Sequence, residues 1–201
     1  MGNVILTGYF RNGVTFGAIT LGGATNDSDQ IFVAKLDNNG STLWAHMYGD
    51  PPNGSIANQQ ASAVAVDPSD NIIFVGQFAN KLDLGNGNPI LVKGNTDAFV
   101  AKVDKTGANI LYAKTYGAAG STLSATRVAV DSGGNAVFLG TFNGSVNFGF
   151  GGPTAANAMG DDAYLLRVSS AGASAWALTS TIRPMSLTIT MASGIESSSS
   201  R

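Results

Sequence analysis

The chain has 201 residues, of which 44% are hydrophobic and 12% charged, with 26 glycines and a formal net charge of −2. This balance argues against a nucleic-acid-binding protein, because such proteins usually present a basic face. No cysteine is present, which excludes disulfide bonds, thiolate catalysis and cysteine-bound zinc. No apolar stretch approaches the roughly 20 residues that a membrane-spanning helix needs, and the N-terminal residues lack the pattern of a signal peptide.

Three copies of one sequence unit follow one another along the chain. Each copy contains an asparagine, an apolar run and a Gly-x-Phe motif, and the motif recurs at intervals of 68 and then 64 residues. A second apolar segment, a turn glycine and an aromatic residue complete the unit. Such periodicity identifies a repeat architecture. In chain order the matched segments are 3–10, 31–37, 40 and 44; then 71–78, 98–104, 107 and 112; then 135–142, 163–169, 172 and 176.

Each unit is predicted to form four antiparallel strands. Residues 99–103 alternate between two faces, and residues 72–75 are apolar throughout, as in a strand covered on both faces. Asp, Asn and Gly between these runs favour tight hairpins. A further short strand pair is predicted within 82–93, and no stretch shows the 3.6-residue period of a helix. In the middle copy the four strands are predicted at 62–67, 71–78, 97–104 and 109–117.

The pattern Val-Ala-Val-Asp-x-x-x-Asn, then an apolar run and Asp-Ala-Phe-Val-Ala-Lys-Val-Asp, resembles the bacterial SBBP-type β-propeller repeat. The resemblance covers residues 2 to 180 and implies an all-β fold of repeated four-stranded blades. The expected repeats are about 2–60, 61–124 and 125–180. Residues 181–201 depart from the pattern and are expected to form a C-terminal strand and a disordered, serine-rich tail. The family occurs in secreted and surface proteins, so the resemblance implies that localisation.

The first unit lacks its own first strand, because the sequence enters the pattern at the second one. Three blades are too few to close an ordinary propeller of four to eight. We therefore expect an incomplete propeller, preferably a fragment of a longer exported protein. The alternatives are closure by a C-terminal strand at 186–192 and a self-complementing half that dimerises into six blades. In each case the open ends favour self-association.

Catalytic residues are not apparent. His46 is the single histidine, and it takes the repeat position of Lys114, which predicts a polar surface or edge position rather than a general base. Glycosidases need two facing carboxyl groups, but the repeats contain no glutamate, and Asp161 and Asp162 are adjacent on a predicted strand and point to opposite faces. The chain by itself is not expected to be an enzyme.

Aspartates in the predicted turns are the candidate metal ligands. Asp67, Asp70 and Asp131 supply hard oxygens of the kind that calcium prefers, although no bidentate glutamate follows at the EF-hand spacing. The preferred alternative is a turn whose carboxylate accepts backbone N–H bonds. No cofactor is otherwise expected. The basic residues Lys35, Lys102 and Arg167 share one repeat position. They could line a channel, but snorkelling from a strand edge is favoured.

The resulting functional expectation is a non-catalytic binding or scaffold module of an exported or cell-surface protein. Its loops would contact a protein or carbohydrate surface, with no nucleic acid and no membrane span. Two alternatives stay open: a fragment of a propeller hydrolase or lyase whose site needs further blades, and a calcium-dependent carbohydrate-binding module. Judged from loop position alone, the candidate contact segments are 22–29, 50–60, 85–96 and 150–161.

Overall fold

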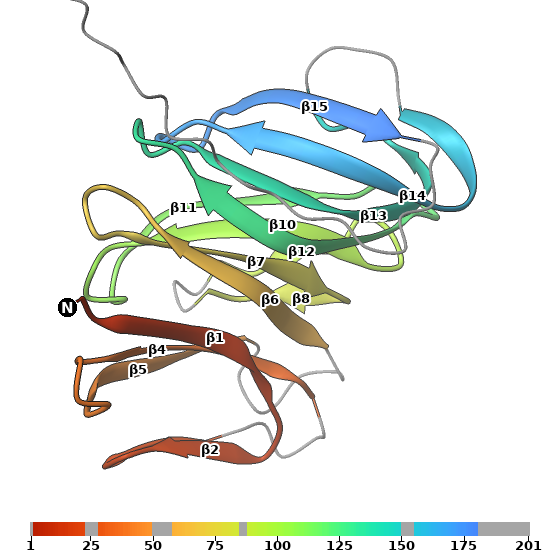
Figure 1. Ribbon diagram of the computed structural model, residues 1–201. Helices are drawn as coiled ribbons and strands as arrows, with labels where there is room; N and C mark the ends of the chain where they lie inside the picture. The colour runs from red at the N-terminus through yellow and green to blue at the C-terminus, as the bar shows by residue number, and fades with distance from the viewer. Residues whose placement is uncertain (1, 23–27, 50–57, 85–87, 150–154, 181–201) are drawn as a thin grey trace, which may run out of the picture.

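A computed structural model describes residues 2–22, 28–49, 58–84, 88–149 and 155–180. Throughout these residues the fold is all-β: every regular element is a strand, and all pairings within the sheets are antiparallel. Three principal sheets follow one another in sequence, and they lie one above the next (Figure 1). This confirms the predicted all-β class with antiparallel sheets, and the described part of the chain contains no helix.

The three sheets correspond to the three sequence repeats. The first sheet has three strands in the order β1-β4-β5, whereas the second and third have four strands each, in the orders β11-β10-β7-β6 and β12-β13-β14-β15. Their bounds are β1 Val4–Phe10, β4 Gln30–Leu36 and β5 Thr42–Tyr48; β6 Gln59–Val66, β7 Ile72–Phe78, β10 Asp97–Val103 and β11 Ile110–Tyr116; and β12 Thr122–Val130, β13 Ala136–Val146, β14 Ala155–Val168 and β15 Ser174–Ser180.

The segment between the second and third strands of a unit differs among the copies. In the first two copies it forms a separate hairpin, whereas in the third β13 and β14 lengthen and pair with each other through register shifts. Residues 155–161, predicted as part of a contact loop, therefore belong to a strand; the rest of that segment lies outside the described residues. The hairpins are β2 Gly13–Phe16 with β3 Ile19–Gly22, and β8 Lys81–Leu82 with β9 Ile90–Leu91.

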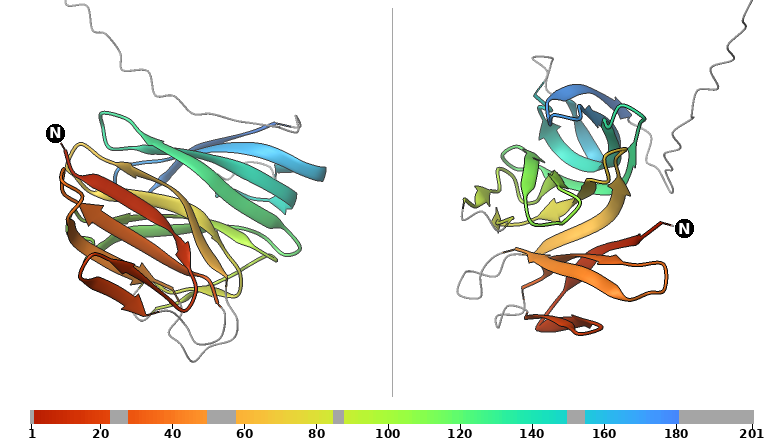
Figure 2. Two further views of the ribbon diagram at one scale, coloured as in Figure 1. Left: turned by 60° about the horizontal axis from the view of Figure 1, so that its bottom comes forward. Right: turned by 90° about the vertical axis from the view of Figure 1, so that its left-hand side faces the viewer.

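Two apolar layers hold the sheets together, because a strand sends alternate side chains to opposite faces. Ile72 and Phe74 of β7 pack toward the first sheet with Ile31. The intervening Ile73 joins the other layer, with Phe138 of the third sheet. The second sheet is thus covered on both faces, which explains its uninterrupted apolar strand. Figure 2 shows the same stacking from two further sides.

The glycine of the Gly-x-Phe motif allows a close approach between strands. The first strand of each four-stranded sheet, β6 or β12, is here called its inner strand. At Gly76 an added Cβ would collide with the backbone carbonyl of Gln60 on β6, and at Gly140 with that of Ser124 on β12. The inner strands β6 and β12 both shift register beside this point. A bulge brings the two backbones together there, and only glycine leaves room for it.

Candidate functional site

The most buried charged pair of the described residues joins Asp67, which follows β6, to Lys102 on β10. The two side chains are 3% and 6% exposed, and the carboxylate oxygen lies 2.7 Å from Nζ. Backbone N–H groups of Ser69 and Asn71 also donate to Asp67. Burial by itself raises the pKa of Asp67, but the hydrogen bonds from Lys102, Asn71 and Ser69 outweigh it and hold the pKa below its usual value.

An equivalent pair, Asp131 with Arg167, recurs in the third sheet. Its charged atoms are 3.1 Å apart, but both side chains are 31% exposed. Hydrogen bonds, chiefly from Asn135 with a further one from Arg167, lower the pKa of Asp131 to about 2. Register explains the recurrence, because Ile73 pairs with Lys102 in β7–β10 as Val137 pairs with Arg167 in β13–β14.

Asp67 and Asp131, two of the three predicted calcium ligands, already use their carboxylate oxygens in these ion pairs and in turn hydrogen bonds. The carboxylates of Asp67 and Asp131 each accept two backbone N–H bonds from the turn that follows, as in the turn interpretation. Asp70 is exposed within the first of these turns and has φ of 64°. Among the described residues, no three His, Cys, Asp or Glu side chains gather as a metal site would require.

The expectation that the repeated basic residue snorkels from a strand edge is wrong for Lys102. β10 is a central strand, flanked by β7 and β11, and the ammonium group is buried in the ion pair. Lys102 also donates to the carbonyl of Ser170, at 3.1 Å. Ser170 lies in the turn between β14 and β15, which form the outer hairpin of the third sheet. Lys35 makes the corresponding bond to Lys105 of the second sheet at 3.4 Å. The repeated cation therefore joins one sheet to the next.

Aromatic residues of the outer strands make a second repeated contact between sheets. Trp44 of β5 lies against Gly107, in the outer turn of the second sheet, and Tyr112 of β11 lies against Gly172, the equivalent glycine of the third. The recurring aromatic of the sequence unit therefore packs between neighbouring sheets at these two positions. Trp176 occupies the same position on β15 and is partly exposed.

His46 takes part in the same layer of contacts. Its ring lies 5.1 Å from that of Trp44 and 6.4 Å from that of Tyr48, and Nε2 is 3.2 Å from the carbonyl oxygen of Thr106. Tyr48 donates from its hydroxyl to Gly107 at 2.6 Å. The histidine is thus half-buried in an inter-sheet contact.

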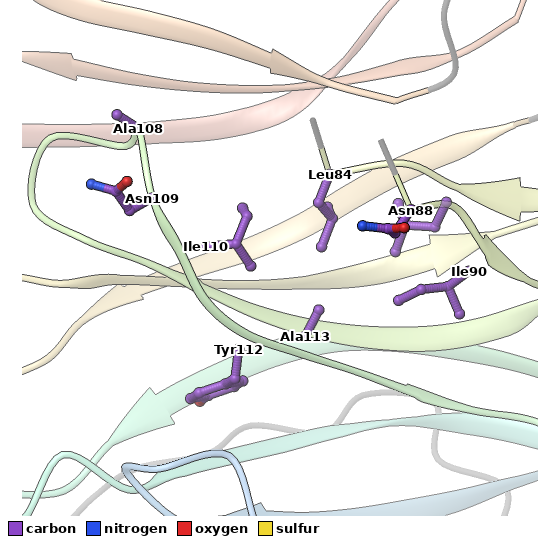
Figure 3. Close-up of a pocket in the computed structure, with 9 residues that line it drawn as sticks. Leu84, Asn88, Ile90, Ala108, Asn109, Ile110, Tyr112 and Ala113 are labelled. Carbon is purple, nitrogen blue, oxygen red and sulfur yellow. The ribbon is translucent and has the colours of Figure 1, made fainter. Parts of the chain in front are cut away.

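A hollow of about 520 Å³ opens on the outer side of the second sheet. One wall comes from the segment around β8 and β9, and the other from β11 and the turn before it (Figure 3). Apolar and polar atoms contribute about equally to its surface, and two asparagine amides are among the polar groups. The hydroxyl of Tyr112 is buried and has no hydrogen-bond partner in the part of the chain that the structure describes, and burial raises the pKa of this residue well above its usual range. The lining residues are Leu82, Leu84, Asn88, Ile90, Ala108, Asn109, Ile110, Tyr112 and Ala113.

A second polar cluster lies between the first and second sheets, at the start of β4 and β6. Buried Asp29 pairs with Arg11 at 2.5 Å and accepts a hydrogen bond from Gln60 at 2.6 Å. Beside it Gln30 and Gln59 are fully buried, and neither side-chain amide has a hydrogen-bond partner among the described residues. Burying four amide atoms without hydrogen bonds lowers the stability of the fold. No sequence signal marks this cluster, because glutamine is not part of a recognisable motif.

The predicted site residues are therefore only partly brought together. Asp67 and Asp131 lie in separate sheets, each with its own cation. Asp161 is exposed on β14, next to half-buried Asp162. Of the predicted contact segment 50–60, residues 50–57 lie outside the described residues. Segments 22–29 and 85–96 are described in part. Among the described residues of these segments, Asn88 and Ile90 of 85–96 line the hollow. The described part of the chain has no helix with the length and apolarity to cross a membrane.

Comparisons with known proteins give a structural neighbour and no family. No protein-family model matches the sequence, and no curated protein matches it. Among solved structures, the chain is similar to a protein of unknown function from Bacteroides caccae, with 10% sequence identity and a TM-score of 0.22. The alignment covers 89% of this chain and 93% of that one. The all-β fold is thus shown by the chain's own structure, and these comparisons assign it no family.

Proposed function

We propose that the chain is a non-catalytic binding module of an exported or cell-surface protein, built as an incomplete β-propeller. The repeated inter-sheet bonds support this arrangement: Lys35 and Lys102 each reach the outer hairpin of the following sheet, at equivalent positions. A contact that recurs with a shift of one repeat is expected for units stacked in a regular array. The SBBP-type resemblance belongs to the same proposal.

The hollow on the second sheet is the proposed contact site, and its lining is the single observation that carries the binding role. A concave surface that combines apolar side chains with a few amides is typical of sites that accept an apolar group and orient it by hydrogen bonds. Leu91 of β9 and Leu111 of β11 are exposed on the two elements that form its walls. We propose that an apolar side chain of a protein partner enters the hollow beside Ala113.

An apolar fluorescent probe, 8-anilinonaphthalene-1-sulfonate, tests whether the hollow accepts such a group. The folded chain is expected to enhance the probe's fluorescence, and Ala113→Phe is expected to remove most of the enhancement by filling the hollow. Leu178→Phe is the control, because Leu178 is exposed on β15 and lies outside the hollow. Circular dichroism checks that each variant is folded. Equal enhancement by wild type and Ala113→Phe would contradict the proposed site.

A further inference from the structure

Asn39 stands directly before the turn glycine Gly40, in the turn between β4 and β5 of the first sheet. In such a pair the backbone nitrogen of the glycine is placed to attack the side-chain amide carbon of the asparagine. Glycine favours this attack, because it has no Cβ to obstruct it and its backbone rotates freely. The equivalent turns of the other two sheets have Thr106 and Ala171 at this position, and neither side chain carries an amide.

The turn leaves the side chain of Asn39 open to solvent. Asn39 is exposed, and the hydrogen bond that it makes within the turn comes from its backbone N–H, which donates to Asp37 Oδ1 at 2.8 Å. The Gly40 N–H donates to the backbone carbonyl of Asp37 at 3.1 Å. Only this one bond, in an exposed turn outside the strand ladders, has to open before the nitrogen of Gly40 attacks.

Asn143 and Gly144 show what tertiary structure does to the same pair of residues. Both lie within β13, where Asn143 pairs with Thr122 of β12 and Gly144 pairs with Ala158 of β14. At Gly144 an added Cβ would lie 3.1 Å from the Cα of Ser121, so the backbone is closely packed. Attack within β13 would require the strand to leave its neighbours, and its backbone groups to lose their partners.

Asn12 and Gly13 form a third such pair, exposed at the start of the β2–β3 hairpin. The Gly13 N–H donates to the carbonyl of Arg11 at 2.6 Å, against 3.1 Å for the bond of Gly40. The attacking nitrogen is therefore held more tightly in this pair than in the turn of the first sheet. Two further Asn-Gly pairs, 53–54 and 86–87, lie outside the described residues.

We propose that Asn39 is a self-modification site, at which the side-chain amide is replaced by a carboxylate through a cyclic imide. The Gly40 nitrogen attacks Cγ of Asn39 and loses its proton to water, and the new C–N bond closes a succinimide ring. The bond between Cγ and Nδ2 breaks, and ammonia leaves with a proton taken from water. Water then opens the ring at either of its carbonyls, which gives aspartate or a β-linked isoaspartate. In sum one water is consumed and one ammonia is released.

Both products change the turn of the first sheet. Each adds a negative charge two residues from Asp37, whose carboxylate accepts the backbone N–H bonds of Asn39 and Ser41. The isoaspartate also lengthens the main chain by one methylene, which alters the spacing between these two donors. The turn of the first sheet thus passes from an amide to an acid form with age, whereas the sister turns with Thr106 and Ala171 stay as they are.

Site-resolved mass spectrometry of the full chain, incubated at mildly alkaline pH, follows the conversion. Asn39 is expected to gain the mass difference between a hydroxyl and an amino group, and to yield a mixture of aspartate and isoaspartate. Asn12 is expected to convert more slowly, and Asn143 about tenfold more slowly, the factor that breaking one or two backbone hydrogen bonds implies. In urea, where the chain is unfolded, the three rates are expected to converge.

Two variants of the same turn separate this reaction from exposure alone. Asn39→Thr, which introduces the residue of the second sheet's turn, is expected to abolish the conversion at this position. Asn38→Thr is the matched control, because Asn38 is exposed in the same turn but is not followed by glycine. It is expected to leave the conversion of Asn39 unchanged, and circular dichroism checks that each variant is folded.

Three results would overturn the proposal. The first is a folded chain in which Asn39 does not convert, and the second is conversion to aspartate without isoaspartate, which would mean direct hydrolysis rather than a cyclic imide. The third is conversion of Asn12 or Asn143 in the folded chain as fast as that of Asn39.

Discussion

The buried ion pair of the second sheet gives a sharp test of the energetics. Lys102→Met removes the cation and leaves the Asp67 carboxylate at 3% exposure with only turn N–H groups and the amide of Asn71 to stabilise it. Removing one member of a buried pair typically costs about 3–5 kcal/mol, because the remaining charge stays desolvated. We expect a loss of that size in the free energy of unfolding, a large share of the roughly 5–15 kcal/mol of an ordinary domain.

Arg167→Met is the matched control, because Arg167 occupies the same register position in the third sheet. Its pair with Asp131 is 31% exposed on both sides, and solvent screens it. We expect a loss of less than about 1 kcal/mol there. Combining Lys102→Met with Asp67→Asn is expected to recover part of the larger loss, since the orphaned charge disappears while the amide oxygen still accepts the turn N–H bonds.

Equilibrium urea unfolding measures these differences. Trp44 lies between the first and second sheets and Trp176 on the third, so tryptophan fluorescence and circular dichroism together test whether the transitions coincide. The reasoning is refuted if Lys102→Met costs less than about 1 kcal/mol, or if Arg167→Met costs as much as Lys102→Met.

Three further predictions use other contrasts between the repeats. Gly40 and Gly107 have φ of 83° and 74°, but only at Gly107 would a Cβ meet a neighbouring side chain, at 2.6–2.9 Å. Alanine at Gly40 should therefore cost only the backbone strain of about 1–2 kcal/mol, with a further 1–3 kcal/mol or so at Gly107, both read from urea midpoints. Tyr48→Phe should cost about 1 kcal/mol by losing its bond to a carbonyl, whereas Tyr112→Phe, which removes an unpartnered hydroxyl, should be neutral or stabilising by thermal unfolding. The pKa of Asp131 is lowered to about 2, so its contribution to stability is complete above the unfolded pKa of about 4 and is lost as the pH falls through about 2. Stability measured from pH 5 to 2 should fall less steeply in Asp131→Asn than in wild type, and equal slopes would contradict this.

Local sequence patterns predicted the strands closely. The strands predicted at 62–67, 71–78, 97–104 and 109–117 are observed as β6, β7, β10 and β11, with their ends shifted by at most three residues. Alternation and turn residues are local properties, so a single sequence is sufficient to locate them. The third copy was harder, because whether its intervening segment forms a separate hairpin or extends β13 and β14 depends on pairing over distance.

The sequence by itself determined the all-β class, the three repeats and the turns with their aspartates. Tertiary structure decided what those residues do. A period of two shows that Lys102 shares a face with its neighbours at alternate positions, but not that the next sheet covers that face or that Asp67 lies 2.7 Å away. The hollow between β9 and β11 and the burial of the glutamines at the start of β4 and β6 likewise arise only where distant segments meet. Burial is a property of surfaces that meet, and residues distant in the chain supply one of the two surfaces.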